Sequence, residues 1–308
     1  MQKHSKNVPS DHFGNGDAGD VQSQGIGWAC TICFSWFGGD MKSGQRRNVQ
    51  SACYAFVAAG LLLHSTFGWT QEKKNTPELV VAAAADLSTA LQEIADNYKE
   101  KAGVKVKLSL GASGALTQQI LNGAPFDLFF SADMGYPRQL IGTGQADAAS
   151  LYQYAVGKLV LWVPADSRLD VERQGMNALL DPSVNKIAIA NPQHAPYGQA
   201  AVAALKHYGL YDRVADRLVL GENISQAAQF VESGNAQAGF VALAHALAPG
   251  MQGKGRYWQV PVEAYPALAQ GVVVLANSPH KKEAAEFVDY VKTKAAADVL
   301  RKYGFTVP

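Results

Sequence analysis

From residue 78 onwards, apolar positions follow two alternating spacings. Short apolar runs at 79–83 and 128–130 are typical of buried strands, and residues 104–110 alternate as in a half-buried strand. Between them, residues 87–98 and 116–121 carry apolar side chains every three or four positions, which indicates amphipathic helices. This βαβαβ order predicts a mostly parallel sheet with helices on both faces.

The same pattern recurs in the second half of the chain. Further strands are predicted at 158–163, 187–190, 217–220, 238–243 and 271–276, and further helical regions at 199–208, 225–233 and 281–303. We therefore expect an α/β fold of two lobes, each a mostly parallel sheet flanked by helices, joined by crossing strands near 160–163 and 260–270. The first lobe would comprise 78–160 and a return segment 263–308, the second lobe 161–262, and a ligand cleft would lie between them.

Four predicted strand-to-helix junctions carry small or hydroxyl residues: Ala84-Ala85-Asp86-Leu87-Ser88, Ala112-Ser113-Gly114, Pro196-Tyr197-Gly198 and Glu222-Asn223-Ile224-Ser225. Free backbone N–H groups and the helix dipole make a helix N-terminus attractive to anions. Two junctions from each lobe would converge on one point and suit a tetrahedral dianion. Such junctions also cap helices in domains that bind nothing there, so the residues alone leave both interpretations open.

The balance of charged residues and the absence of catalytic motifs exclude several classes of function. The 27 Lys and Arg residues balance 26 Asp and Glu residues, which argues against a nucleic-acid partner, because phosphate-backbone binding needs clustered positive charge. The sequence has no phosphate-binding loop, no Ser-His-Asp order and no zinc-protease motif. We expect no catalytic residues, no cofactor and no metal held directly by the protein, so the protein is not expected to be an enzyme.

The first 70 residues contain targeting signals. Met41 is followed by basic residues and by an apolar run at 52–63, as in a secretory signal peptide, which we place at 41–70. Residues 1–40 are then upstream sequence or a disordered extension, the alternative being a genuine N-terminal module. All three cysteines precede residue 54, and the Cys30–Cys33 pair has no second ligand pair. The signal predicts a periplasmic protein.

The stretch Gly111-Ala-Ser-Gly-Ala-Leu-Thr-Gln-Gln-Ile120, followed by Asn122 to Asp133, resembles the corresponding run of periplasmic molybdate-binding proteins of ABC importers. The resemblance extends over about 78–308. It implies a solute-binding protein that captures molybdate or tungstate and delivers it to an ABC permease in the inner membrane. We expect a monomer.

The resemblance also implies site residues. Ser113 matches the family's serine at the second junction, Tyr197 falls at a backbone donor after a proline, and Ile224 falls at an apolar amide donor. The first junction contributes Asp86, Leu87 and Ser88. Flanking candidates are Ala85, Gly114, Asn223 and Ala242.

Two positions depart from the family pattern. Asp86 stands where the family has a serine hydroxyl, and Ala242 where it has a tyrosine hydroxyl. A phenol from Tyr197 would offset the second loss. For Asp86 three explanations compete: the carboxylate caps the helix from Leu87 to Lys99, it is protonated and donates to the ligand, or the ligand is not molybdate. The alternatives are thus another small oxyanion, a cation, or a ligand-sensing receptor domain of the same fold.

Overall fold

The computed structural model describes residues 77–308. The expected signal peptide at 41–70, the segment 1–40 and the three cysteines lie outside the described residues. Within the described part, no helix has both the length and the apolar character needed to cross a membrane.

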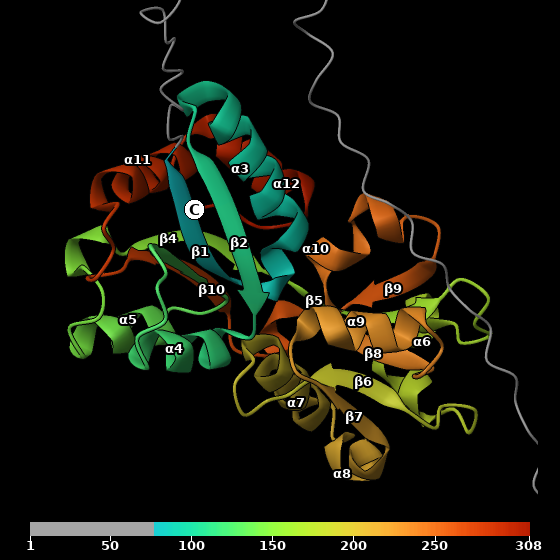
Figure 1. Cartoon of the computed structure of the whole chain (residues 1–308). Coiled ribbons are helices and arrows are strands. Elements are labelled where there is room, and N and C mark those ends of the chain that lie inside the picture. The colour runs from blue at the N-terminus through green and yellow to red at the C-terminus, as the bar shows by residue number, and fades with distance from the viewer. Residues whose placement is uncertain (1–76) are drawn as a thin grey trace, which may run out of the picture. The chain divides into compact units, whose positions relative to one another are not determined.

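The described residues form two five-stranded sheets (Figure 1). The first has the order β2-β1-β3-β10-β4 and consists of β1 (Glu78–Ala84), β2 (Lys105–Gly111), β3 (Leu128–Ser131), β4 (Tyr152–Gly157) and β10 (Leu268–Val274). The second has the order β7-β6-β8-β5-β9 and consists of β5 (Leu159–Pro164), β6 (Ile187–Ala190), β7 (Leu218–Gly221), β8 (Ala238–Ala242) and β9 (Gly255–Gln259).

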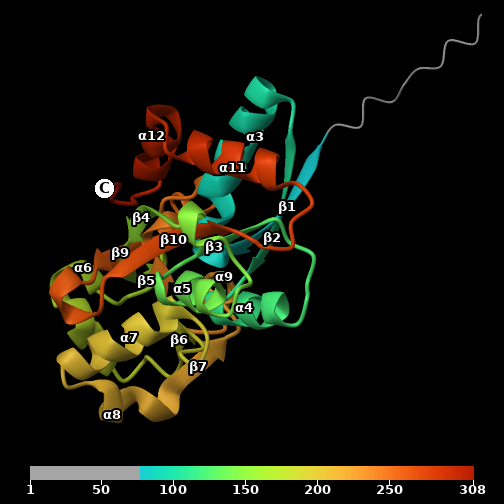
Figure 2. The ribbon, with the colours of Figure 1, turned by 90° about the vertical axis from the view of Figure 1, so that its left-hand side faces the viewer.

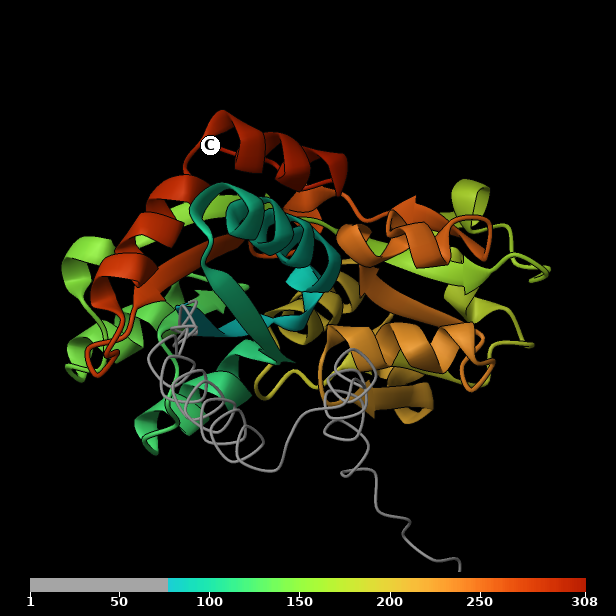
Figure 3. The ribbon, with the colours of Figure 1, turned by 45° about the horizontal axis from the view of Figure 1, so that its top comes forward.

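Helices cover both faces of the first sheet because its strands are apolar on both sides. Phe130 points into a core with α3 (Ser88–Ala102), α11 (Lys281–Val291) and α12 (Lys294–Lys302). Its neighbour Phe129 points into the opposite core with α4 (Ser113–Leu121) and α5 (Gly135–Gly142). Figure 2 shows the two layers on either side of the sheet, and Figure 3 shows α3 and the red C-terminal helices together over one face.

The second sheet is covered by α7 (Pro196–His207) and α9 (Ile224–Glu232), which pack against its central strands. Shorter helical segments complete the chain: α6 (Val171–Gln174), α8 (Tyr211–Val214), α10 (Leu243–Ala246), and the 3-10 turns η1 (Ala85–Leu87), η2 (Ala148–Ser150), η3 (Gly175–Leu180), η4 (Ala215–Arg217), η5 (Pro249–Met251) and η6 (Val262–Ala264). The two sheets define two lobes, the first containing β1–β4 and β10, the second β5–β9. The expected two-lobed α/β architecture is confirmed.

Each sheet is mixed, with four strands running in one direction and one strand running against them. In the first sheet β1 pairs in parallel with β2 and β3, whereas β10 is antiparallel to β3 and β4. In the second, β6 pairs in parallel with β7 and β8, whereas β5 is antiparallel to β8 and β9. The antiparallel strands lie where the chain passes between the lobes, since β5 follows β4 directly and β10 follows β9. A crossing chain enters the sheet from the other lobe and runs against the βαβ strands.

Candidate functional site

A small cavity of about 10 Å³ lies between the two lobes. Its walls come from β1 and η1, from the starts of α4, α7 and α9, and from the end of β3. The lining residues are Ala84, Ala85, Asp86, Gly111, Ala112, Ser113, Ala132, Ala195, Pro196, Tyr197 and Ile224. No lysine, arginine or histidine is among them.

Ser113 is the first residue of α4 and is 1% exposed. Its Oγ accepts a hydrogen bond from the Ala132 N–H at 2.9 Å. Because that bond uses an oxygen lone pair, the hydroxyl hydrogen stays available to donate. The Ser113 N–H, at the first helical position, has no acceptor within its own helix.

Tyr197 follows Pro196 at the start of α7 and reaches across to the first lobe. Its phenol donates to Asp86 Oδ2 at 3.0 Å. Gly157, at the end of β4, leaves space for this phenol, because a Cβ at that position would lie 2.2 Å from Tyr197 Oη. The small residue in the first lobe thus permits the contact between lobes.

Ile224 begins α9, and the preceding Asn223 caps that helix. The Asn223 side chain accepts hydrogen bonds from the N–H groups of Ser225 and Gln226. The cap serves those two amides, and the Ile224 N–H is left at the cavity without an intrahelical acceptor. Three helices of nine, twelve and nine residues, α4, α7 and α9, therefore begin at one cavity.

Asp86 is the only acidic or basic side chain that lines the cavity, and it is 2% exposed. Oδ2 accepts hydrogen bonds from the Tyr197 phenol and the Gln270 amide, whereas the buried Oδ1 has no partner among the described residues. Burial raises the pKa of this carboxyl to about 6, and the bonds from Gln270 and Tyr197 act in the opposite direction.

The expectation that Asp86 caps the following helix is wrong. Neither η1 nor α3 has a side-chain cap, and Leu87 occupies the position before α3. Oδ2 of the carboxyl accepts instead from the Tyr197 phenol of the second lobe and from the Gln270 amide of the first lobe, because both donors are buried and need an acceptor.

Gln270 and Tyr154 form the support behind Asp86, and the sequence did not single them out. The Tyr154 phenol donates to Gln270 Oε1 at 2.7 Å, which orients the amide so that Nε2 faces Asp86. Gln270 is fully buried in β10. A glutamine inside an otherwise apolar strand could have indicated a buried polar contact, but the predicted strand began one residue later, at Gly271.

Several candidates do not line the cavity. Leu87 is buried in the core of the first lobe, and the Ser88 N–H donates to the Ala85 carbonyl. Ala242 is buried at the end of β8. The Gly114 N–H donates to the His194 carbonyl at 2.9 Å, so this residue joins the lobes. Of the predicted set, the structure brings together Ala85, Asp86, Ser113, Tyr197 and Ile224.

A second contact between the lobes involves Ser225 and His245. Ser225 Oγ donates to the Ala85 carbonyl at 3.2 Å and lies 2.8 Å from His245 Nε2. Since the hydroxyl has one hydrogen, His245 Nε2 is the donor in this arrangement. Burial lowers the pKa of His245 to about 4, which keeps the ring neutral at physiological pH.

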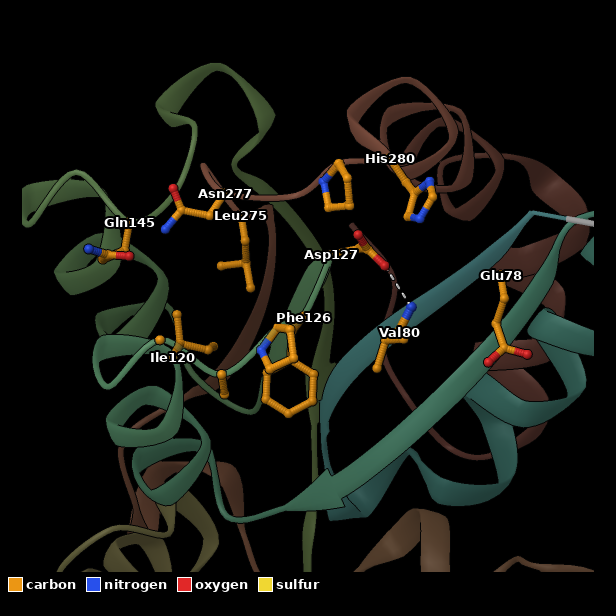
Figure 4. A pocket seen from close by; sticks show the side chains of 13 residues that line it. Glu78, Val80, Ile120, Phe126, Asp127, Gln145, Leu275, Asn277 and His280 are labelled. Carbon is orange, nitrogen blue, oxygen red and sulfur yellow. Dashed lines mark hydrogen bonds between the residues drawn. The ribbon is translucent and has the colours of Figure 1, made fainter.

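A larger cavity of about 260 Å³ lies in the first lobe, and none of the starts of α4, α7 and α9 lines it (Figure 4). Its buried carboxylate, Asp127, is fully paired, because it accepts bonds from the Val80 N–H and the Ser278 hydroxyl. With no unpaired buried donor, this cavity is a poor candidate for an anion site. No group of three His, Cys, Asp or Glu side chains suited to a metal occurs within 77–308.

Two lobes that meet around a small cavity at the starts of three helices have the architecture of a solute-binding protein. Residues 79–306 match the sequence family described as bacterial extracellular solute-binding protein. The chain belongs to this family.

Individual proteins similar to this chain point to a narrower group within the family. The chain is 38% identical over 228 residues to the molybdate-binding protein ModA of Rhodobacter capsulatus, which covers 74% of this chain and 88% of that protein. It is 39% identical over 229 residues to ModA of Azotobacter vinelandii, covering 74% and 89%. The solved Azotobacter vinelandii periplasmic molybdate-binding protein is similar with a TM-score of 0.71 and 34% identity, covering 75% of this chain and 99% of that chain. These findings confirm the resemblance seen in the sequence.

Proposed function

We propose that this protein captures molybdate, or the nearly isosteric tungstate, between its lobes and delivers it to an ABC permease. The observation that carries the proposal is the convergence of three helix N-termini and the Ser113 hydroxyl on one cavity lined by no cationic side chain. The similarity to molybdate-binding proteins supports the choice of ligand.

Neutral donors suit this ligand. Molybdate is a tetrahedral dianion at neutral pH, and its oxygens accept hydrogen bonds. The N–H groups of Ser113, Tyr197 and Ile224 present partial positive charge from three directions. Each charge-assisted bond contributes roughly 1.5–3 kcal/mol, so a few of them give tight binding without a buried lysine or arginine.

The site includes residues from both lobes, so binding would favour closure. Asp86, Ala85 and Ser113 come from the first lobe, and Tyr197 and Ile224 from the second. A ligand that contacts both lobes stabilises the closed arrangement. The closed surface would then be recognised by the permease, with the protein acting as an exported monomer in the periplasm.

The test is titration calorimetry of the purified protein with molybdate, tungstate, sulfate and phosphate. We expect tight binding of the first two and weak binding of the smaller oxyanions. Ile224→Pro removes one donor at a helix position that proline tolerates, and it should weaken molybdate binding about tenfold or more. Lys294→Pro, at the first position of α12, is the matched control and should leave affinity unchanged.

Wild-type protein that binds none of the four oxyanions would exclude the proposal. Tight binding of sulfate or phosphate in preference to molybdate would reassign the ligand. An Ile224→Pro variant that melts like the wild type and binds molybdate equally well would remove the start of α9 from the site.

A further inference from the structure

The two oxygens of Asp86 have different surroundings. Oδ2 is saturated by the Tyr197 phenol and the Gln270 amide. Oδ1 is buried, has no partner among the described residues, and belongs to a side chain that lines the cavity. A buried polar atom without a partner is unfavourable, so Oδ1 is the oxygen of this cavity-lining carboxyl that still needs a hydrogen-bond partner.

A carboxylate oxygen and an oxyanion oxygen are both acceptors, so they repel each other when no hydrogen lies between them. The repulsion disappears when one proton occupies the space, because the pair then forms an O–H···O bond between a neutral acid and a charged acceptor. Such charge-assisted bonds are short and strong.

We propose that Asp86 shares one proton with the bound oxyanion through Oδ1, so that capture of a molybdate dianion takes up a proton from solvent. This inference rests on the proposed function. In the step, one solvent proton forms the Oδ1–H bond of Asp86, and this group donates to a ligand oxygen. The charge of carboxylate plus dianion falls from three negative charges to two, and no covalent bond of the oxyanion breaks.

Two buried phenols adjoin Asp86, one in direct contact and one through Gln270. The phenols of Tyr197 and Tyr154 have pKa values raised well above 10 by burial and by the Asp86 charge, so they stay neutral donors. Tyr265 and Asp133 lie further out, and burial raises the pKa of each. His245, beyond Ser225, has its pKa lowered to about 4. No cation among the residues that line the cavity would hold Asp86 ionised.

With the two lobes in contact as in this structure, the Asp86 carboxyl has a pKa of about 6. At about pH 7.5 Asp86 is mostly ionised and must gain nearly one proton on binding. At about pH 5.5 it already carries most of that proton. Linkage therefore predicts that affinity falls about tenfold for each pH unit above pH 6.

The experiment is calorimetric titration of the purified protein with sodium molybdate in buffers of different ionisation enthalpy, which counts protons taken up. We expect close to one proton per molybdate at about pH 7.5 and well under half of one at about pH 5.5. Asp86→Asn should take up none, should bind with nearly pH-independent affinity, and should retain binding, because its amide donates in place of the acid. Asp147→Asn changes an exposed carboxylate that accepts the Ala149 N–H, and should behave as wild type.

Wild-type binding without proton uptake at about pH 7.5 would overturn this proposal and leave the proposed function intact. Equal uptake by wild type and Asp86→Asn would do the same, by placing the proton elsewhere. Absence of oxyanion binding by the wild type at both pH values would overturn the proposed function and this inference together. The wild-type proton count decides the question even if Asp86→Asn does not fold.

Discussion

Asp86 is a carboxyl group buried without a cation, and its ionisation is therefore unfavourable in the folded chain. Its pKa is raised from 3.8 to about 6, with burial as the largest cause. Unfolding restores the ordinary pKa. The contribution of this group to stability is fully present below about pH 3.8 and is lost as the pH rises through 6.

Asp86→Asn should therefore stabilise the ligand-free protein near neutral pH. The shift of about two pKa units corresponds to roughly 3 kcal/mol at most. We expect a higher melting temperature than wild type at about pH 7.5, and a difference that disappears at about pH 3.5. Asp147→Asn is the control, and it should show no such pH-dependent gain. An Asp86→Asn variant less stable than wild type at both pH values would contradict the prediction.

The sequence was sufficient to predict those site residues that lie at a junction between a strand and the following helix. Ser113, Tyr197 and Ile224 lie where predicted strands are followed by helices, so local spacing was enough to place them at junctions of the two sheets, and the family resemblance singled them out. Gln270 lies 184 positions from Asp86, and nothing in the local pattern indicates that an amide in β10 meets a carboxyl in η1. The direction of the Asp86 side chain depends on that distant partner, which is why the capping prediction failed.

At the scale of elements, apolar periodicity predicted the central strands and the edge strands β2 and β7, and it missed the edge strands β4 and β9. β4 and β9 lie at the ends of their sheets and carry polar and aromatic residues, so neither gives a clean apolar run. The predicted helix at 281–303 is interrupted between α11 and α12, where the Thr293 side chain accepts a bond from the Ala296 N–H and starts a new helix.

The start of α9 also joins the lobes through Ser225, whose hydroxyl donates to the Ala85 carbonyl. Ser225→Ala removes this bond and leaves His245 Nε2 without its partner. We expect molybdate to dissociate several-fold faster, because the closed arrangement loses one hydrogen bond worth about 1 kcal/mol. Stopped-flow measurement of ligand release tests this.

Ser233→Ala, at the other end of α9, is the matched control, since within 77–308 its hydroxyl bonds only to the Phe230 carbonyl and the exposed Asn235 side chain. It should release ligand at the wild-type rate. Equal release rates for Ser225→Ala and wild type would show that this bond does not contribute to closure.

At the scale of the whole molecule, the absence of cationic side chains from the cavity lining determines how binding responds to salt. Helix dipoles and buried hydroxyls are screened far less than surface charges. We expect the molybdate affinity to change less than about threefold between about 0.02 and about 0.5 M sodium chloride. Titration calorimetry at both concentrations measures it, and a steep loss of affinity would indicate a cationic group in the bound site.

The strand order of the first sheet has a consequence for biogenesis. β10 lies between β3 and β4, in the interior of that sheet, although it is the last strand to leave the ribosome. The strands of the second sheet, β5 to β9, are contiguous in the chain and are all synthesised before it. The lobe that is begun first is thus completed last. Until β10 arrives, β3 and β4 expose unpaired edges, so a nascent or shortened chain lacking residues 268–274 is open to aggregation and proteolysis in its N-terminal half.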